Sequence, residues 1–285
     1  MTGAIIINKP KDITSRDVVN KLNQILETRQ IGHTGTLDPL ATGVLVCLIG
    51  RATKLSNLLT NQDKEYIATF KLGILTDTLD ITGNILKEEN KTFNKKEIIN
   101  TINSFKGTYD QEVPIYSAVK VDGKKLYEYA RENKDVKLPT RNVSIYNIKV
   151  LSIKKDTITI KTKVSKGTYI RSLIRDIGFK LGTYATLTDL ERTQVGNFNI
   201  KDSYTLDEVL KNKHKLIPVS EILKDYPQED INPEMLYKVK HGQILNMTIN
   251  DYILFKVKDT PVALYKKYDK DHNKIKPYVM FYINK

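Results

Sequence analysis

The residue types best suited to chemistry are gathered in one short segment, residues 32–43, which reads Gly-His-Thr-Gly-Thr-Leu-Asp-Pro-Leu-Ala-Thr-Gly. It lies between an amphipathic helical pattern and an apolar run, so we predict a loop held between two core elements. Pro39 turns the preceding residue away from helical dihedrals, and glycines allow close approach of a ligand. Asp38 is therefore presented on extended or turning backbone, where its carboxylate can act as a nucleophile or a base. The alternative is that Asp38 only caps or turns the chain.

The elements on either side of this loop can be predicted from apolar patterns. Residues 4–8 read as a short strand, and Thr14 and Ser15 offer an N-cap for a helix that reaches about Thr28 on an apolar stripe. The apolar run 44–49 has the length of a fully buried strand. We therefore expect a helix to lead into the loop and a core strand to leave it.

The composition of the chain favours a nucleic-acid partner. Its 285 residues, 40% of them hydrophobic, suffice for one large domain and a small one. The formal net charge of +13 favours a polyanion, although solvated surface lysines could account for the same excess. The 16 tyrosines and 7 phenylalanines supply flat faces on which an unstacked base could rest. Charge and turn residues rise between residues 211 and 233, so we expect a domain boundary near residue 230.

Several functional classes are disfavoured by the sequence. The apolar run 4–7 is too short for a signal peptide core or a membrane span, so neither export nor membrane insertion is expected. The single cysteine, Cys47, lies in the apolar run 44–49 and should be a buried, inert thiol, which fits a reducing cytoplasm. The 4 histidines lack ligand spacing, and no Walker A or dinucleotide fingerprint is present. We therefore expect a cytoplasmic protein without a metal or an organic cofactor.

Residues 32–45, the loop with Val44 and Leu45 after it, resemble the signature loop of the TruB family of tRNA pseudouridine synthases. Further resemblances to that family lie in residues 9–15, 63–66, 76–80, 111–118 and 167–171. The pattern departs from the family at Asp12, where glycine is usual, and at Val113, where proline is usual. Because aspartate also tolerates left-handed backbone, we expect Asp12 to keep the turn.

The resemblance assigns catalytic roles to three residues. The family's essential aspartate falls on Asp38, and the arginine that pairs with it, from a Gly-Thr-Tyr-Ile-Arg motif, falls on Arg171. A poorly hydrated carboxylate takes up a proton unless a counter-charge stands beside it, so a guanidinium is the needed partner. Tyr66 matches the tyrosine that lies against the target base, where it could stack and shuttle a proton. Without the resemblance, Arg171 reads as a solvated helix charge and Tyr66 as a strand aromatic facing the core.

Three further residues receive substrate-binding roles from the same resemblance. Tyr169 would pack in the pocket, Asp80 would hold the active-site network, and His33 would occupy the space that the flipped base vacates. Taken alone, Asp80 is a turn former and His33 is a loop histidine bonded to backbone.

The resemblance also implies an α+β pseudouridine synthase fold. Residues 1–230 would form the catalytic domain, with a central mixed, mainly antiparallel sheet flanked by helices. Its basic insertion, at about 114–141, would fold down over the tRNA, and residues 231–285 would form a small PUA-like β-barrel that binds RNA. The implied activity is isomerisation of uridine 55 in the T loop of tRNA to pseudouridine by base flipping, and a monomer is expected.

Alternatives stay open at this point. Residues 32–35 match the GXXG loop of a KH-type RNA-binding protein, but that loop must run into a second helix and Pro39 argues against one. A role in RNA folding could replace catalysis or accompany it. A family member that acts with a guide RNA fits less well, given the bacterial-looking insertion and the short tail. Asp38 itself has three possible modes of action, namely attack on the sugar, attack on the base, or removal of a sugar proton.

Overall fold

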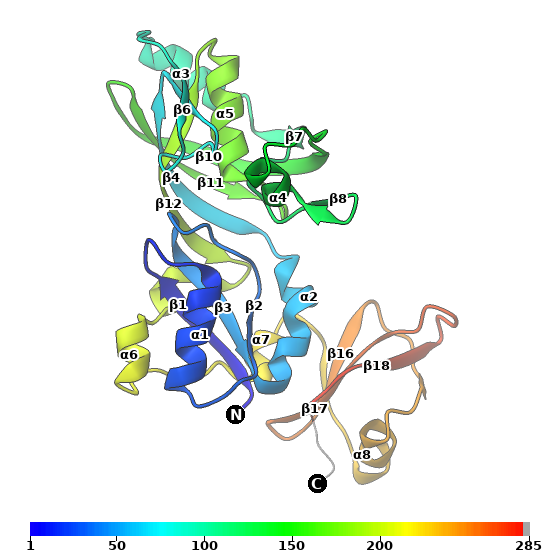
Figure 1. Ribbon diagram of the computed structural model, residues 1–285. Helices are drawn as coiled ribbons and strands as arrows, with labels where there is room; N and C mark the ends of the chain where they lie inside the picture. The colour runs from blue at the N-terminus through cyan, green and yellow to red at the C-terminus, as the bar shows by residue number, and fades with distance from the viewer. Residues whose placement is uncertain (282–285) are drawn as a thin grey trace.

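A nine-stranded sheet runs through the larger part of the molecule, as the ribbon in Figure 1 shows. This computed structural model describes residues 1–281, so residues 282–285 of the expected second domain lie outside the described part. The strands of the sheet are β1 (Gly3–Lys9), β2 (Ile31–His33), β3 (Thr42–Ile49), β4 (Lys64–Leu72), β7 (Gly107–Glu112), β10 (Thr140–Lys154), β11 (Thr157–Val164), β12 (Ala185–Val195) and β13 (Phe198–Asn199). Their order is β1-β3-β12-β4-β11-β10-β7, with β2 beside β3 and β13 beside β12. Among the described strands of this nine-stranded sheet, only the β12–β3 pairing is parallel, which confirms the expected mixed, mainly antiparallel sheet.

Helices flank this sheet, and two small hairpins leave it. The helices are α1 (Ser15–Ile25), α2 (Ser56–Thr60), α3 (Lys95–Asn103), α4 (Leu126–Arg131), α5 (Ile170–Lys180), α6 (Leu206–Leu210) and α7 (Val219–Ile222), with 3₁₀ turns η1 (Gly50–Leu55) and η2 (Ile200–Asp202). The hairpins are β5 (Ile74–Thr76) with β6 (Ile85–Glu88), and β8 (Lys120–Val121) with β9 (Lys124–Lys125). The second hairpin and α4 lie between β7 and β10, and in Figure 1 they project from the sheet as a separate green unit.

The helix that leads into the Asp38 loop begins where its capping residues predict. The Thr14 side chain accepts a hydrogen bond from the Asp17 backbone N–H, and the Asp17 carboxylate accepts one from the Thr14 N–H, at 3.1 and 2.8 Å. This reciprocal capping box satisfies two of the free donors at a helix start. Just before it, Asp12 adopts a φ of +64°, which confirms that aspartate keeps the turn where the family has glycine.

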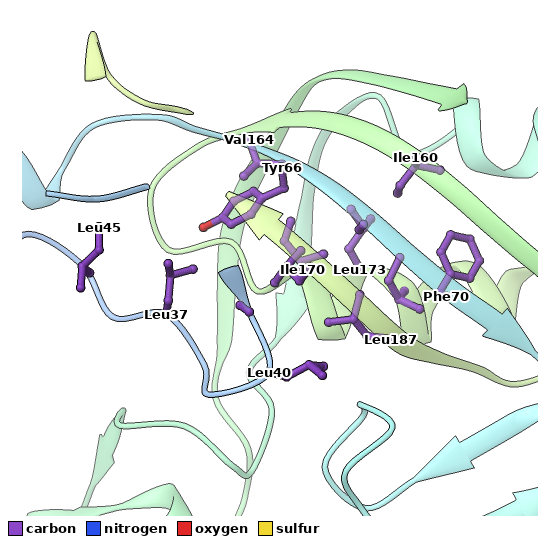
Figure 2. Packing of buried hydrophobic residues seen from close by; sticks show 14 of the residues in the cluster. Leu37, Leu40, Leu45, Tyr66, Phe70, Ile160, Val164, Ile170, Leu173 and Leu187 are labelled. Atoms are coloured by element: carbon purple, nitrogen blue, oxygen red, sulfur yellow. The ribbon is translucent and has the colours of Figure 1, made fainter. Parts of the chain in front are cut away.

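The core lies between the sheet and its helices. On β4 every second side chain is buried, namely Tyr66, Ala68, Phe70 and Leu72. Across from them α5 buries an apolar stripe, and the resulting cluster reaches Leu37 and Leu40 of the Asp38 loop (Figure 2). Cys47 is fully buried on β3, and burial raises the pKa of its thiol to about 12, which confirms an inert cysteine.

The C-terminal part forms a second sheet of five strands, consistent with a PUA-like domain. Its strands are β14 (Gln228–Asp230), β15 (Leu245–Asn246), β16 (Tyr252–Val257), β17 (Thr260–Lys267) and β18 (Lys274–Met280), in the order β14-β16-β17-β18-β15, with helix α8 (Pro233–Lys240) beside them. Leu254, Leu264 and Val279 pack in one cluster with residues of β1 and β3, so the two sheets share an apolar contact. The expected boundary near residue 230 falls at the end of β14. Within residues 1–281, no helix is long and apolar enough to cross a bilayer.

Candidate active site

The loop that carries Asp38 joins β2 to β3, and hydrogen bonds to its backbone hold it against the start of α1. The buried Ser15 hydroxyl accepts from the Leu37 N–H at 2.9 Å and lies 3.1 Å from the Leu37 carbonyl. On the other side of Asp38, the Pro39 carbonyl accepts from the Asp12 N–H at 2.9 Å. The backbone on both sides of Asp38 is therefore held by one neighbouring segment, so its carboxylate has a defined position before any ligand arrives.

Two buried cations bind the carbonyls of the same loop. The Lys9 ammonium donates to the Pro39 and Ile13 carbonyls at 3.2 and 2.7 Å, and its burial lowers the pKa of the amine to about 8. The Arg192 guanidinium donates to the carbonyls of Gly35, at 3.0 Å, and of Val44, at 2.8 Å. These charges satisfy loop carbonyls that strand pairing leaves free.

Asp38 and Arg171 form a two-point ion pair. Arg171 Nε lies 2.8 Å from Asp38 Oδ2, and Arg171 Nη2 lies 3.2 Å from Asp38 Oδ1. The Arg171 side chain is only 6% exposed, whereas that of Asp38 is 38% exposed. The guanidinium is thus enclosed by protein, while the carboxylate keeps a free edge that a ligand can reach.

Arg171 also joins two further segments to the Asp38 loop. Its Nη1 donates to the Thr78 carbonyl at 2.9 Å, and its Nη2 donates to the Tyr116 carbonyl at 3.0 Å. Tyr116 lies at the start of the segment that carries β8, β9 and α4, and Thr78 lies in the turn after β5. One buried side chain on the first turn of α5 therefore determines how three remote loops meet.

Asp80 holds the turn that Arg171 contacts, and it makes no hydrogen bond to Asp38 or Arg171 within residues 1–281. Its Oδ1 accepts from the Thr78 hydroxyl at 2.9 Å and from the Thr82 N–H at 3.0 Å. Between them Leu79 adopts a φ of +63°, a left-handed conformation that is costly for a leucine. We infer that Asp80 acts through this turn, because it keeps the Thr78 carbonyl aimed at Arg171.

Tyr66 lies on β4 with its ring in the apolar cluster, 8% exposed overall. In Figure 2 its hydroxyl points out of the cluster, toward the loop that carries Leu37. The hydroxyl makes no hydrogen bond within the described residues. It is also not one of the polar atoms there that are buried without a hydrogen-bond partner. A tyrosine with a fixed ring and a free hydroxyl can contact a ligand beside Asp38.

Tyr169 is positioned by a chain of hydrogen bonds that reaches back to β7. The Tyr169 N–H, at the N-cap of α5, donates to Gln111 Oε1 at 2.8 Å. Gln111 Nε2 in turn donates to the Tyr109 hydroxyl at 2.7 Å, and that hydroxyl donates to Asp176 Oδ2 at 3.3 Å. Because the Tyr109 hydroxyl donates its proton to Asp176, the Tyr109 oxygen accepts from the amide nitrogen of Gln111. The amide oxygen of Gln111, Oε1, is then free to accept from the Tyr169 N–H. The start of α5, and with it Arg171, is fixed by this chain.

His33 stands at the end of β2, where it is half-buried. Its Nδ1 accepts from the Gly35 N–H at 3.4 Å, and burial, together with Arg16 and Arg192, lowers the pKa of the imidazole below its usual value. The ring is therefore held neutral near pH 7. Neither His33 nor Tyr169 makes a hydrogen bond to the Asp38–Arg171 pair in the described part of the chain.

The resemblance paired Arg171 with Asp38, and the structure brings the two side chains together, but three positioning residues carried no role in the sequence. Lys9, Gln111 and Arg192 are buried and each holds backbone of the site. For Gln111 and Arg192, the only local signal was an amide or charged side chain at a position of β7 or β12 that alternation assigns to the interior, whereas β1 is buried on both faces and gave no such signal for Lys9. In residues 1–281 no group of histidine, cysteine and carboxylate side chains is placed to hold a metal ion. What the site offers is therefore a carboxylate, a buried guanidinium and a tyrosine hydroxyl.

The chain is similar to known proteins over most of its length. Residues 23–170 match the model of the TruB family pseudouridylate synthase N-terminal domain, and residues 171–225 match that of the tRNA pseudouridylate synthase B C-terminal domain. The chain is 44% identical to the tRNA pseudouridine synthase B of Clostridium tetani over 85% of each protein, and 37% identical to that of Bacillus cytotoxicus over 97% of this chain and 96% of the relative.

A solved structure supports the fold over nearly the whole chain. The structure of an H/ACA RNP bound to a substrate RNA containing 2'-deoxyuridine superimposes with a TM-score of 0.73, at 25% identity, over 99% of this chain and 85% of that one. The family models and the relatives span the Asp38 loop, β4 and α5, so the elements that build the site are those that the family shares. The chain therefore belongs to the TruB family of pseudouridine synthases, and its activity is that of an isomerase.

Proposed function

We propose that this protein isomerises uridine 55 in the T loop of tRNA to pseudouridine, with Asp38 as its essential catalytic residue. In this reaction the base leaves its N-glycosidic bond, turns, and is rejoined to the ribose through carbon, so nothing is consumed. The observation that carries the proposal is the half-exposed carboxylate of Asp38 held at two points by the buried Arg171. The relatives named tRNA pseudouridine synthase B support tRNA as the substrate.

The uridine must leave the folded RNA loop before Asp38 can reach it. Unstacking a base costs roughly a few kcal/mol, which stacking and phosphate contacts must offset. We propose that His33, kept neutral by its surroundings, fills the space that the base leaves, and that Tyr66 stacks on the base with its free hydroxyl toward the reacting carbon. Arg171 supplies the counter-charge that an anionic Asp38 needs when the bound RNA excludes water.

The segment between β7 and β10 is suited to clamping the RNA. It carries cations on aromatic rings, with Lys124 Nζ 5.0 Å from the Tyr129 ring centre and Arg131 5.2 Å from that of Tyr127. Tyr116, at the root of this segment, is bonded to Arg171, so closing the clamp and arranging the catalytic pair are coupled. We further propose that residues 231–285 add RNA contacts, and that the protein works as a monomer in the cytoplasm.

Asp38→Asn tests the catalytic role. The amide keeps the shape of the side chain but supplies neither a nucleophile nor a base, so we expect conversion to fall by at least about 10³-fold while the Kd for tRNA changes less than about threefold. Conversion is measured under single-turnover conditions with an unmodified tRNA transcript. Unaltered turnover would remove Asp38 from the mechanism.

The matched control is Asp189→Asn. Asp189 is an exposed carboxylate on β12 that pairs with Lys11 at 3.2 Å and makes no hydrogen bond to Asp38 or Arg171 within residues 1–281, so this variant should convert tRNA at the normal rate. The modified position is tested separately, by mapping pseudouridine in RNA from cells that lack the protein. Loss at position 55 alone is expected, and an unchanged position 55 would contradict the proposed substrate.

A further inference from the structure

A cleft of about 450 Å³ lies where three remote segments meet. They are the end of α2, the start of β10, and the turn between β11 and α5, the last of which leads directly to Tyr169. The lining residues are Thr60, Asn61, Arg141, Asn142, Lys166 and Gly167. Two of the six are cationic and none is acidic, so the cleft has the charge of an anion site.

Arg141 faces this cleft without an acidic partner in the described residues. Its side chain is exposed at the start of β10, and its guanidinium lies near Gly167. A Cβ at residue 167 would lie 3.5 Å from Arg141 Nη1, and the φ of Gly167 is +80°. The positive φ, rather than lack of space, favours glycine at this turn.

Two lysines add positive charge on the α2 side of the cleft. Lys166 Nζ contacts only a neutral amide oxygen, Asn61 Oδ1, at 3.4 Å. Lys64 Nζ donates to the carbonyls of Thr60 and Gln62, at 2.8 and 2.6 Å, directly behind the lining. Burial, with smaller contributions from the charges of Arg192 and Lys166, lowers the pKa of Lys64 to about 8, whereas Asp63 opposes the shift. An anion in the cleft would relieve this repulsion.

Two acidic side chains near the cleft, Asp63 and Asp110, are not part of its lining, and each accepts a hydrogen bond from a neutral group. Asp63 accepts from the Tyr146 hydroxyl at 3.3 Å, and Asp110 accepts from Asn142 Nδ2 at 2.9 Å. Neither carboxylate forms an ion pair with Arg141 or Lys166 in residues 1–281. The positive charge of the cleft is therefore available to an incoming ligand.

The position of the cleft relates it to the reacting base. Gly167 precedes Arg171 by four residues, and Lys64 shares a face of β4 with Tyr66. Thr60 and Tyr66 are six positions apart in the chain, which limits their separation to roughly 20 Å, or a few nucleotides of RNA. We propose that this cleft binds a backbone phosphate of the RNA strand that delivers the uridine to Asp38, through Arg141 and Lys166. The inference rests on the proposed function, because it takes the RNA substrate from there.

The salt dependence of binding tests the proposal. Each neutralised phosphate adds about one to the slope of log Kd against log salt concentration, so Arg141→Gln and Lys166→Gln should each lower that slope by about one. The Kd at a fixed physiological salt concentration should rise about three- to tenfold. Binding of an unmodified tRNA transcript is measured between 50 and 400 mM KCl, after circular dichroism and Tm show that each variant is folded.

Lys154→Gln is the matched control, since Lys154 ends the same strand at its far end from Arg141 and is also exposed. Its slope should equal that of the unaltered protein. The proposal is overturned if the Arg141 and Lys166 variants keep the full slope, or if the control lowers it equally, which would show a general effect of net charge. Failure of the proposed function is distinguishable: an unaltered protein that forms no pseudouridine, with slopes reduced only at Arg141 and Lys166, would leave the phosphate site standing.

Discussion

Two arginines one turn apart on α5 pair with carboxylates in different ways. Arg171 binds one carboxylate, Asp38, and also donates hydrogen bonds to the Thr78 and Tyr116 carbonyls. Arg175 binds two carboxylates, Glu112 and Asp176, each at 2.8 Å. Both guanidiniums are largely buried, but Asp38 lies on a loop and Asp176 lies on the helix itself.

The difference between the two pairs lies in what each carboxylate has left to offer. The Asp38 carboxylate has no hydrogen-bond donor other than Arg171 in the described residues, and its side chain is 38% exposed. Asp176 is bonded to Arg175 and to the Tyr109 hydroxyl, with its side chain 19% exposed. The same ion-pair chemistry therefore yields a carboxylate open to a ligand in one place and a link between α5 and β7 in the other.

Of the changes that compare the two arginines, the largest effect is expected when Arg171 is removed. Arg171→Met leaves Asp38 without its counter-charge and two carbonyls without their donor, so we expect single-turnover conversion to fall by about 10²–10³-fold, a loss of about 2.7–4 kcal/mol of transition-state stabilisation. Arg171→Lys keeps the charge but cannot bind two carboxylate oxygens and two carbonyls at once, and should recover only part of the rate. A normal rate of conversion in Arg171→Met would show that Arg171, like Arg175, is not needed for the reaction.

A smaller effect, on stability, is expected at Arg175. Arg175→Met leaves Asp176 and Glu112 without their cation beside β7, so the free energy of unfolding should fall by about 2–3 kcal/mol, below the value for a sealed pair because the Glu112 side chain is 48% exposed. Denaturant titration measures this change. Conversion by the folded variant should stay within about threefold of normal. If Arg175→Met instead lost conversion without losing stability, Arg175 would contribute to the reaction as Arg171 does.

The contrast between the two arginines also marks how far the sequence could lead. Both fall in one helical segment, and from periodicity alone each reads as a charge off the apolar stripe. The resemblance to a family placed Arg171 opposite Asp38, 133 residues away, and the structure brings the two together. No sequence pattern near Arg175 predicted its contact with Glu112 or the nearby contact of Tyr109 with Asp176, because these contacts depend on how β7 and α5 pack.

Local chemistry was more predictable than long-range contact. The start of α1 at Thr14 and the left-handed turn at Asp12 follow from residues within a few positions of each other. Arg192 and Gln111 reach backbone that is 157 and 58 residues distant, so no window of sequence contains both partners. Buried polar side chains that break an apolar alternation are the one signal that could have singled them out.

The smallest expected effect is a pH dependence confined to Asp176. Burial raises the pKa of this carboxyl above its usual value, against the opposing charge and hydrogen bond of Arg175. The folded protein therefore holds a proton there that the unfolded chain has released, so the contribution of Asp176 to stability is full below the unfolded pKa and is lost as the pH rises through the folded pKa. Asp176→Asn cannot titrate, and the Tm of the unaltered protein relative to this variant should fall by about 1–3 °C between pH 4 and 7. Asp110→Asn, at an exposed carboxylate on β7, should show no such trend. A flat or rising difference for Asp176→Asn would mean that Arg175 outweighs burial and that this carboxylate resembles Asp38 more closely than its surroundings suggest.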